Sequence, residues 1–199
     1  KICTFLQLPN AKVIRVDKNL GPAHARDVAI RTEKDPEAIM ALVDLDDELE
    51  AHALVTVARH YRSNPDCWVT IGNWHNQHGR RNPQPFYTAE VIDQQKVRDV
   101  ELFNATALRT FRRKLYDAVT QEDLTGPEGE WLETCTDVAI MYPLLDQCMA
   151  KNVEFISDPI YIYNQKLSKG TLARFGKPHK VERLNLLKSK PRKPRYTGA

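Results

Sequence analysis

Short apolar runs of the strand type alternate along this chain with segments whose apolar residues recur at helical spacing. Because they are short and mostly rich in β-branched or aromatic residues, four stretches are expected to form strands: KVIRV (12–16), EAIMALV (37–43), CWVTI (67–71) and VEFI with PIYIY (153–163). The second of these is expected to be buried. This alternation is typical of an α/β layer architecture, in which ligands bind at the carboxyl ends of the strands.

Helices are expected between these runs. Pro22 follows Gly21 and can open a helix. The other expected helices are 48–62, 104–119, 136–151 with Pro143 inside it, and 179–190. Their inward residues are expected to be Leu54, Val57, Ala58 and Tyr61 in the first, Leu108, Phe111, Leu115 and Val119 in the second, and Val181, Leu184 and Leu187 in the last. The polar stretch 72–86 is rich in turn-forming residues and is expected to be a loop.

Composition is that of an ordinary folded domain. The chain has 199 residues, of which 42% are hydrophobic and 28% charged. No run of about 18 apolar residues is present, so we expect no transmembrane helix, and no signal peptide is recognised. The four cysteines (Cys3, Cys67, Cys135, Cys148) show no CxxC spacing, which favours free thiols in a reducing compartment. These features predict a cytoplasmic protein, with the inner face of a membrane as a second possibility.

Positive charge is concentrated at the C-terminal end. Residues 176–199 carry eight Lys or Arg against one acid, whereas residues 1–175 carry 21 against 25, a net of −4. We therefore divide the chain into a folded domain, 1–175, and a basic tail, 176–199. Such a tail could touch an anionic membrane surface, although a solvated surface tail explains the charge equally well. No aromatic-rich basic patch occurs in the body, which argues against nucleic acid as a partner.

The run ALVDLDDEL (41–49) passes from apolar residues directly into carboxylates. In a strand, residues two apart face the same way, so Asp44 and Asp46 are expected to project together while Leu45 turns back to the core. Two such carboxylates repel each other unless a cation lies near them. Mg²⁺ or Mn²⁺ suits these oxygen ligands, with water and substrate phosphates completing the coordination. An Arg or Lys side chain is the alternative cation.

Asp47 has a structural explanation as well as a functional one. It precedes the expected helix over 48–62, and the spacing Asp47-x-x-Glu50 fits a capping box. From the sequence alone, Asp47 can either cap this helix or lie beside a metal ion.

Several segments, taken in order, resemble glycosyltransferases of family two, which are inverting enzymes with the GT-A fold. VDLDDEL is similar to the family's DxDD segment, and NLGPAHARDVAI to its Asn-x-Gly…Ala-Arg-Asn segment, with Asp27 where Asn is usual. WVTIGNW, LRTFRRKLYDAV, TDVAIMYPLLDQ and FISDPIYIYN resemble the segments that follow. The resemblance covers about residues 12–165. It implies a GT-A-like, Rossmann-related α/β fold, with a mixed sheet flanked by helices in a single domain.

The resemblance implies a donor site at the end of the apolar run. Asp46 would bind the metal, Mn²⁺ or Mg²⁺, that bridges the donor diphosphate. Asp44 and Asp47 would lie beside it on ribose, metal or water. The ion would neutralise charge on the leaving nucleoside diphosphate. The glycine-turn segment implies that Asn19, Gly21 and Arg26 lie on the donor side as well.

The resemblance also implies that Asp137 is the catalytic base, which deprotonates the acceptor hydroxyl as it attacks the anomeric carbon. Without the resemblance, an acid in the first turn of a helix is explained by the helix dipole. Further side chains are candidates for phosphate, acceptor or metal contacts, with a core or surface place as the alternative: Trp74, His75, His78, Arg109, Arg112, Arg113, Trp131 and His179.

The implied function is a hexosyltransferase that moves a sugar from a nucleotide-sugar donor, a UDP-sugar by default, to a hydroxyl of a glycan, a lipid-linked or another acceptor. A nucleotidyltransferase-like enzyme and a non-catalytic nucleotide- or sugar-binding domain are the alternatives. The family normally opens with a strand, a helix and a second strand that hold the base and ribose. Only KICTFLQLPNA precedes residues 12–16 here, so we expect this unit to be missing or reduced.

Overall fold

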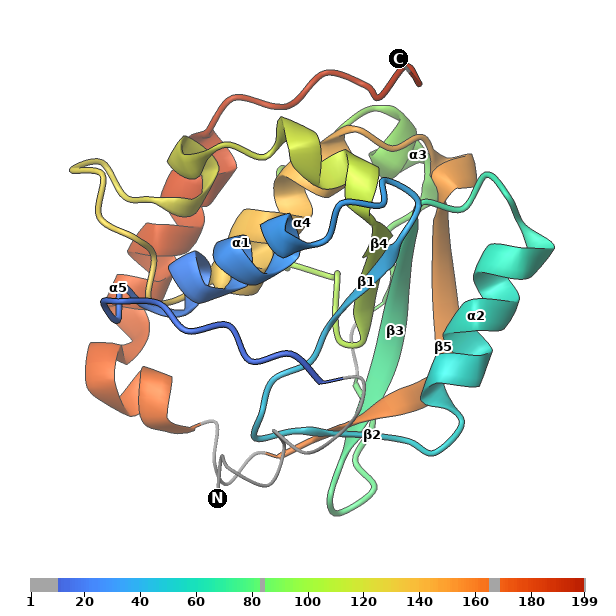
Figure 1. The fold of residues 1–199 in the computed structure, drawn as a ribbon, viewed down its shortest axis with the longest axis horizontal. Helices are drawn as coiled ribbons and strands as arrows, with labels where there is room; N and C mark the ends of the chain where they lie inside the picture. The colour runs from blue at the N-terminus through green and yellow to red at the C-terminus, as the bar shows by residue number, and fades with distance from the viewer. Residues whose placement is uncertain (1–10, 83–84, 165–168, 199) are drawn as a thin grey trace.

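A five-stranded mixed sheet forms the centre of the molecule (Figure 1), in the order β1-β4-β3-β5-β2. The computed structural model describes residues 11–82, 85–164 and 169–198, with side chains from residue 176 onward in the last stretch. The strands are β1 (Ile39–Leu42), β2 (Glu48–Leu49), β3 (Val69–Asn76), β4 (Arg109–Arg112) and β5 (Val153–Tyr163). Strands β3 and β5 are parallel, and the other neighbours are antiparallel. The expected mixed α/β sheet is confirmed.

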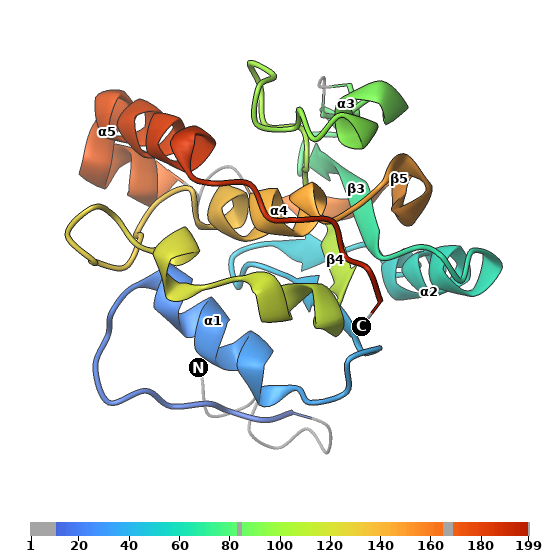
Figure 2. The same cartoon turned by 90° about the horizontal axis from the view of Figure 1, so that it is seen from above.

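Helices cover both faces of this sheet. They are α1 (Pro22–Thr32), α2 (Ala53–Ser63), α3 (Ala89–Asp93), α4 (Thr136–Asp146) and α5 (Lys169–Ser189), with 3₁₀ helices at Arg113–Ala118, Gln121–Leu124 and Ala150–Asn152. Figures 1 and 2 show α1 and α4 on one side of the sheet and α2 on the other. The buried residues accordingly form two apolar clusters, one around α4 and one beneath α2.

The expected helix over 104–119 is wrong, although its inward positions are right. The segment forms β4, which lies between β1 and β3, followed by a 3₁₀ helix. Leu108, Phe111 and Leu115 are fully buried and Val119 nearly so. Apolar residues three and four apart fit a strand followed by a tight turn as well as they fit a helix. The two neighbouring strands decide the outcome, because tertiary pairing overrides local propensity.

The expected strand over 12–16 is also wrong. Residues 11–20 run along the surface, and Val13, Ile14 and Val16 are each more than a third exposed. A strand requires ladder hydrogen bonds to a neighbour, and within the described part of the chain no strand pairs with this segment.

The expected helix over 48–62 begins later than predicted. Glu48 and Leu49 form β2, which pairs with β5, and α2 starts at Ala53. Ala53, Val57 and Tyr61 face the sheet, whereas Leu54, expected inside, is 61% exposed. The short strand uses the residues that were expected to supply the first helical turn.

The remaining strands differ from expectation in extent. The strand expected at 67–71 continues to Asn76 and takes the first part of the expected loop. Residues 153–163 form one strand rather than two. Strand β1 is found as expected, but at an edge of the sheet, with Ile39 41% exposed rather than buried.

Gly72 allows β3 to lie very close to the chain that leads into β4. Its N–H donates to the carbonyl oxygen of Leu108 at 2.9 Å. A Cβ atom at position 72 would lie 2.6 Å from the Leu108 nitrogen. Only glycine fits this approach of two backbones.

The two C-terminal helical predictions are confirmed with corrections. The segment 136–151 forms α4, with Pro143 inside it, and ends at Asp146. The segment 179–190 forms the end of α5, whose helical path is interrupted at Gly176, where φ is 73°. Leu187 is buried as expected, whereas Val181 is 56% exposed.

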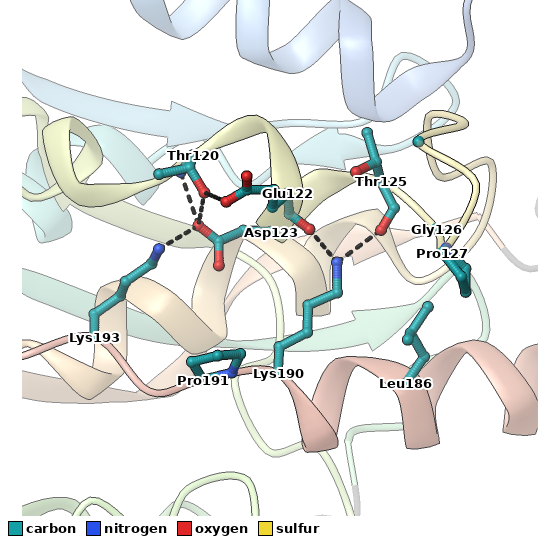
Figure 3. A pocket seen from close by; sticks show the side chains of 11 residues that line it. Thr120, Glu122, Asp123, Thr125, Gly126, Pro127, Leu186, Lys190, Pro191 and Lys193 are labelled. Atoms are coloured by element: carbon teal, nitrogen blue, oxygen red, sulfur yellow. Dashed lines mark hydrogen bonds and ion pairs between the residues drawn. The ribbon is translucent and has the colours of Figure 1, made fainter.

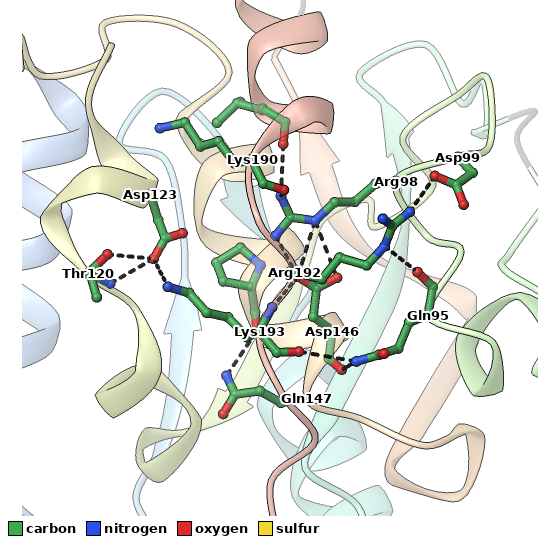
Figure 4. A network of polar contacts seen from close by, with 12 residues as sticks. Gln95, Arg98, Asp99, Thr120, Asp123, Asp146, Gln147, Lys190, Arg192 and Lys193 are labelled. Carbon is green, nitrogen blue, oxygen red and sulfur yellow. Dashed lines mark hydrogen bonds and ion pairs between the residues drawn. The ribbon is translucent and has the colours of Figure 1, made fainter. Parts of the chain in front are cut away.

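A buried ion pair fastens the C-terminal segment to the body (Figure 4). Arg98 and Asp146 are 2% and 0% exposed, and Nε of Arg98 donates to Oδ2 of Asp146 at 3.1 Å. Arg98 also donates to the carbonyl oxygens of Leu187 and Lys190, at 2.9 and 3.2 Å. The backbone N–H of Lys193 donates to Asp146. Part of the basic segment 176–199 is therefore packed against the folded domain.

The described cysteines are unpaired, as expected. Cys67, Cys135 and Cys148 are free thiols. No described helix combines the length and the apolar character needed to cross a bilayer.

Candidate functional site

The carboxylate-rich turn follows the end of β1. The backbone N–H of Asp47 donates to the carbonyl oxygen of Asp44 at 3.1 Å, which closes the turn. Because β1 ends at Leu42, strand alternation does not extend into this segment. Leu45, expected in the core, is 98% exposed. The relative placement of Asp44 and Asp46 therefore comes from a turn and not from the pleat of a strand.

Asp47 does not cap a helix. Its carboxylate accepts hydrogen bonds from the Tyr161 hydroxyl and from the backbone N–H of Asn164, both at 2.7 Å. Helix α2 begins at Ala53, and no side chain caps its first turn. Burial raises the pKa of Asp47, against the lowering effect of these two donors. Asp47 thus ties the turn to the end of β5, and of the two interpretations left open by the sequence, the capping box is wrong.

Asp46 is the carboxylate of this turn that stays available. Its side chain is half-buried, and among the described residues it has no hydrogen-bond or ion-pair partner. A carboxylate left without a partner costs little only where solvent or a ligand cation can reach it. Of the three acids in the turn, Asp46 is the one placed to accept a cation without breaking an existing contact.

Arg26 provides the counter-charge for Asp44. Its guanidinium pairs with the Asp44 carboxylate through Nη2 and with the Thr136 hydroxyl through Nη1. The sequence left open whether a metal ion or a basic side chain neutralises Asp44 and Asp46. For Asp44, an arginine does so in this structure. Because Thr136 opens α4, Arg26 also links the turn after β1 to the helix that carries Asp137.

The glycine turn fixes where Arg26 lies. Gly21 precedes α1 with φ of 93°, a conformation that side chains disfavour, and Pro22 then opens the helix as expected. The Asn19 side chain accepts the Gly21 N–H at 3.1 Å. Asn19 and Gly21 shape the start of α1 in this structure.

Asp137 lies in the first turn of α4, with its side chain one-third exposed. Its Oδ2 accepts a hydrogen bond from Nη2 of Arg109 at 2.9 Å. Cys135, the residue just before α4, adopts a left-handed conformation with φ of 55°. Burial alone would raise the pKa of Asp137, but Arg109 and then Arg26 outweigh that effect and lower it. Asp137 is therefore ionised at neutral pH.

The two tryptophan candidates and two of the arginine candidates have partners within the fold. The Trp74 ring packs on Tyr163 with centroids 5.3 Å apart, and Trp131 meets the edge of His24 at 4.9 Å. Arg112 and Arg113 pair with Glu37 and Asp117. These contacts give each of them a structural role.

His75 forms an ion pair whose strength depends on pH. Its Nε2 lies 2.6 Å from a carboxylate oxygen of Glu50, and its Nδ1 lies 2.9 Å from the carbonyl oxygen of Asn76. Two acceptors are satisfied only when both ring nitrogens carry protons. The hydrogen bond to Glu50 is the largest cause of the raised pKa of His75.

The His75 pair predicts stability that is lost as the pH rises. A raised folded-state pKa gives a contribution that is complete below the unfolded pKa of about 6.5 and disappears as the pH passes the folded value. We expect His75→Gln to lower the free energy of unfolding by about 0.5–1 kcal/mol at pH 5.5 and by less at pH 8.5, as measured by urea unfolding. The exposed His78 serves as the control: His78→Gln should show no such difference. Equal losses for His75→Gln at both pH values would contradict the assignment.

No three His, Cys, Asp or Glu side chains among the described residues form a ready-made metal cage. The donor set nevertheless fits a hard divalent cation that keeps most of its ligands as water and phosphate. Within the described part of the chain nothing pairs with Asp46, and Asp44 already pairs with the Arg26 guanidinium.

A pocket of about 480 Å³ lies elsewhere, between residues 120–129 and residues 186–193 (Figure 3). Lys190 reaches across it to the carbonyl oxygens of Glu122 and Thr125, and Lys193 pairs with Asp123 at 2.7 Å. It contains none of the predicted site residues, so it is separate from the site around Asp137.

Three contributors to the site have no role in the sequence-based prediction. Tyr161 and Asn164 hold Asp47, and Thr136 binds Arg26. Tyr161 and Asn164 belong to the segment FISDPIYIYN, whose resemblance to the family was the available signal. Nothing in the sequence around Thr136 indicates its contact with Arg26.

Comparison with known proteins defines the class. The model of glycosyl transferase family 2 matches residues 1–120, which include the turn 44–47, Arg26 and Arg109 but not Asp137. The chain therefore belongs to glycosyl transferase family 2.

A solved structure supports the fold. The crystal structure of S. aureus TarS 1–349 superposes with a TM-score of 0.57 at 19% identity, over 82% of this chain and 46% of that chain. This likeness confirms the GT-A type of fold, and the chain spans less than half the length of the protein it matches. No curated protein sequence matches this chain.

Proposed function

We propose that this chain is a metal-dependent inverting glycosyltransferase that moves a sugar from a nucleotide-sugar donor, by default a UDP-sugar, to an acceptor hydroxyl. One observation carries the proposal. Arg26 binds both Asp44, in the carboxylate turn, and Thr136, beside Asp137. A candidate donor site and a candidate base are thereby held next to each other at one end of the sheet.

Asp46 and Asp44 would hold Mn²⁺ or Mg²⁺, with water and diphosphate oxygens as the other ligands. Such an ion, when bound, supplies positive charge that stabilises the departing nucleoside diphosphate. Asp44 can turn to the ion only if Arg26 releases it, and the freed guanidinium could then contact the diphosphate. Asn19 and Gly21 would form the adjacent wall of the donor site.

Asp137 would act on the acceptor. Its ionised carboxylate would take the proton of the acceptor hydroxyl while that oxygen forms a bond to the anomeric carbon and the bond to the diphosphate oxygen breaks. A single displacement of this kind inverts the configuration of the anomeric carbon. The acceptor class is a glycan, a lipid-linked or another hydroxyl compound. A cytoplasmic location, with residues 176–199 near an anionic membrane face, stays a prediction.

Calorimetric titration with UDP tests the donor site directly. We expect binding by the unaltered chain in the presence of Mn²⁺, and a loss of at least about tenfold in affinity without the metal or in Asp46→Ala, because the diphosphate then lacks its bridging cation. Asp158→Ala, which removes an exposed carboxylate of β5, should bind as the unaltered chain does.

Two results would contradict the donor site. Binding that is indifferent to both Mn²⁺ and Asp46 would exclude the proposed metal role. No binding of UDP or of other nucleoside diphosphates would argue that this chain does not hold the donor.

A further inference from the structure

Arg109 is placed differently from the other arginines of its segment. It is the first residue of β4 and pairs in register with Leu42, the last residue of β1. The carboxylate turn 44–47 begins two residues after Leu42. Arg109 therefore lies between the end of β1, the carboxylate turn and the start of α4.

The Arg109 side chain is fixed at two points. Its Nε donates to the carbonyl oxygen of Ala105 at 2.7 Å, and its Nη2 donates to Oδ2 of Asp137 at 2.9 Å. The side chain is 14% exposed. A planar guanidinium anchored through Nε has little freedom to rotate, so the position of Nη2 is set by the backbone of the segment before β4.

Other charged groups face Asp137 from the elements around it. Arg26 approaches from α1 and Lys180 from α5, and both act on Asp137 through charge. Cys135, just before the helix, and Tyr142 within it also respond to the Asp137 charge. Arg109 is the one among these with a direct ion pair to the carboxylate.

We propose that Arg109 is the positioning residue of Asp137: it holds the carboxylate through Oδ2, fixes its orientation at the start of α4 and keeps it ionised for an incoming acceptor hydroxyl. The catalytic role of Asp137 in this inference rests on the proposed function. The ion pair between Arg109 and Asp137 is present in the chain without substrate. The lowered pKa of Asp137, to which Arg109 contributes more than any other charge, agrees with it.

The test is a titration of the Asp137 carboxyl by ¹³C NMR in protein labelled at the aspartate side-chain carbons. Asp137→Asn removes one resonance and so assigns it. We expect Arg109→Gln to raise the pKa of Asp137 by about one unit or more. Arg109→Lys keeps the positive charge but lacks the planar guanidinium. It should give a pKa of Asp137 between those of the unaltered chain and Arg109→Gln. Arg112→Gln removes an arginine ion pair from the same strand and should leave the titration unchanged.

An Arg109→Gln protein that titrates as the unaltered chain does would overturn the inference. If that variant fails to fold, the Arg109→Lys protein decides the question, because an unshifted Asp137 there would equally contradict a specific hold by the guanidinium. Once sugar transfer is measured, the acidic limb of the plot of kcat against pH should move to higher pH in Arg109→Gln. Absence of transfer in the unaltered chain would contradict the proposed function, while the NMR titration would still decide the pairing.

Discussion

Replacing Asp146 with Ala should lower the free energy of unfolding by about 3–5 kcal/mol, because it leaves a buried guanidinium without its counter-charge. Arg98 is 2% exposed, and Asp146 accepts from both its Nε and its Nη2. The substitution also removes the acceptor for the Lys193 N–H. The loss therefore reaches the segment that packs the C-terminal end against the body.

Guanidinium chloride unfolding measures this loss, and two variants control it. The exposed pair between Lys151 and Asp66, at 3.7 Å, offers a surface comparison: Lys151→Ala should cost less than about 1 kcal/mol. The double substitution Arg98→Met with Asp146→Leu should cost clearly less than Asp146→Ala alone, because it leaves no buried charge. A loss below about 1 kcal/mol for Asp146→Ala would show that the pair is not closed in solution.

Replacing Asp137 with Asn should reduce kcat for sugar transfer by about 10²–10⁴-fold, because an amide cannot accept the acceptor proton. The shape of the side chain is kept, so KM for the donor should change little. Steady-state kinetics with the donor found by titration measures both values. Asp117→Asn, at an exposed acid paired with Arg113, is the matched control.

The Asp137 variant also separates the candidate functions. A nucleotidyltransferase-like reaction at the same acid turn would not need this base, so a kcat within a few fold of the unaltered value would contradict the inverting mechanism. A non-catalytic binding domain would show donor binding without turnover in either protein.

Burial was more predictable from the sequence than element type. Leu108, Phe111, Leu115 and Val119 were all predicted to face inward and are all buried, yet Phe111 lies in a strand and Leu115 in a 3₁₀ helix, and Leu108 and Val119 flank these two elements. Hydrophobicity reports which side chains leave water. It does not report which neighbour satisfies the backbone, and β4 exists because β1 and β3 lie on either side of it.

The position of the carboxylate turn was predictable for the same reason. An apolar run that ends in acids must leave the core there, and Asp44, Asp46 and Asp47 do lie at the end of β1. Their individual partners were not predictable. For Asp47, a local cap was one of two interpretations left open, but its carboxylate binds Tyr161, which lies 114 residues further along the chain.

The sequence by itself determined the α/β alternation, most of the buried positions and the place where carboxylates gather, because each follows from local chemistry and spacing. Only the tertiary structure decided which charges meet. Arg26 reaches Thr136 across 110 residues, and Arg109 reaches Asp137 across 28. Such pairs depend on how the elements pack, and packing is a property of the whole chain. For that reason, of the three acids in the turn after β1, only Asp46 is left without a partner among the described residues, and Asp137 is held by an arginine.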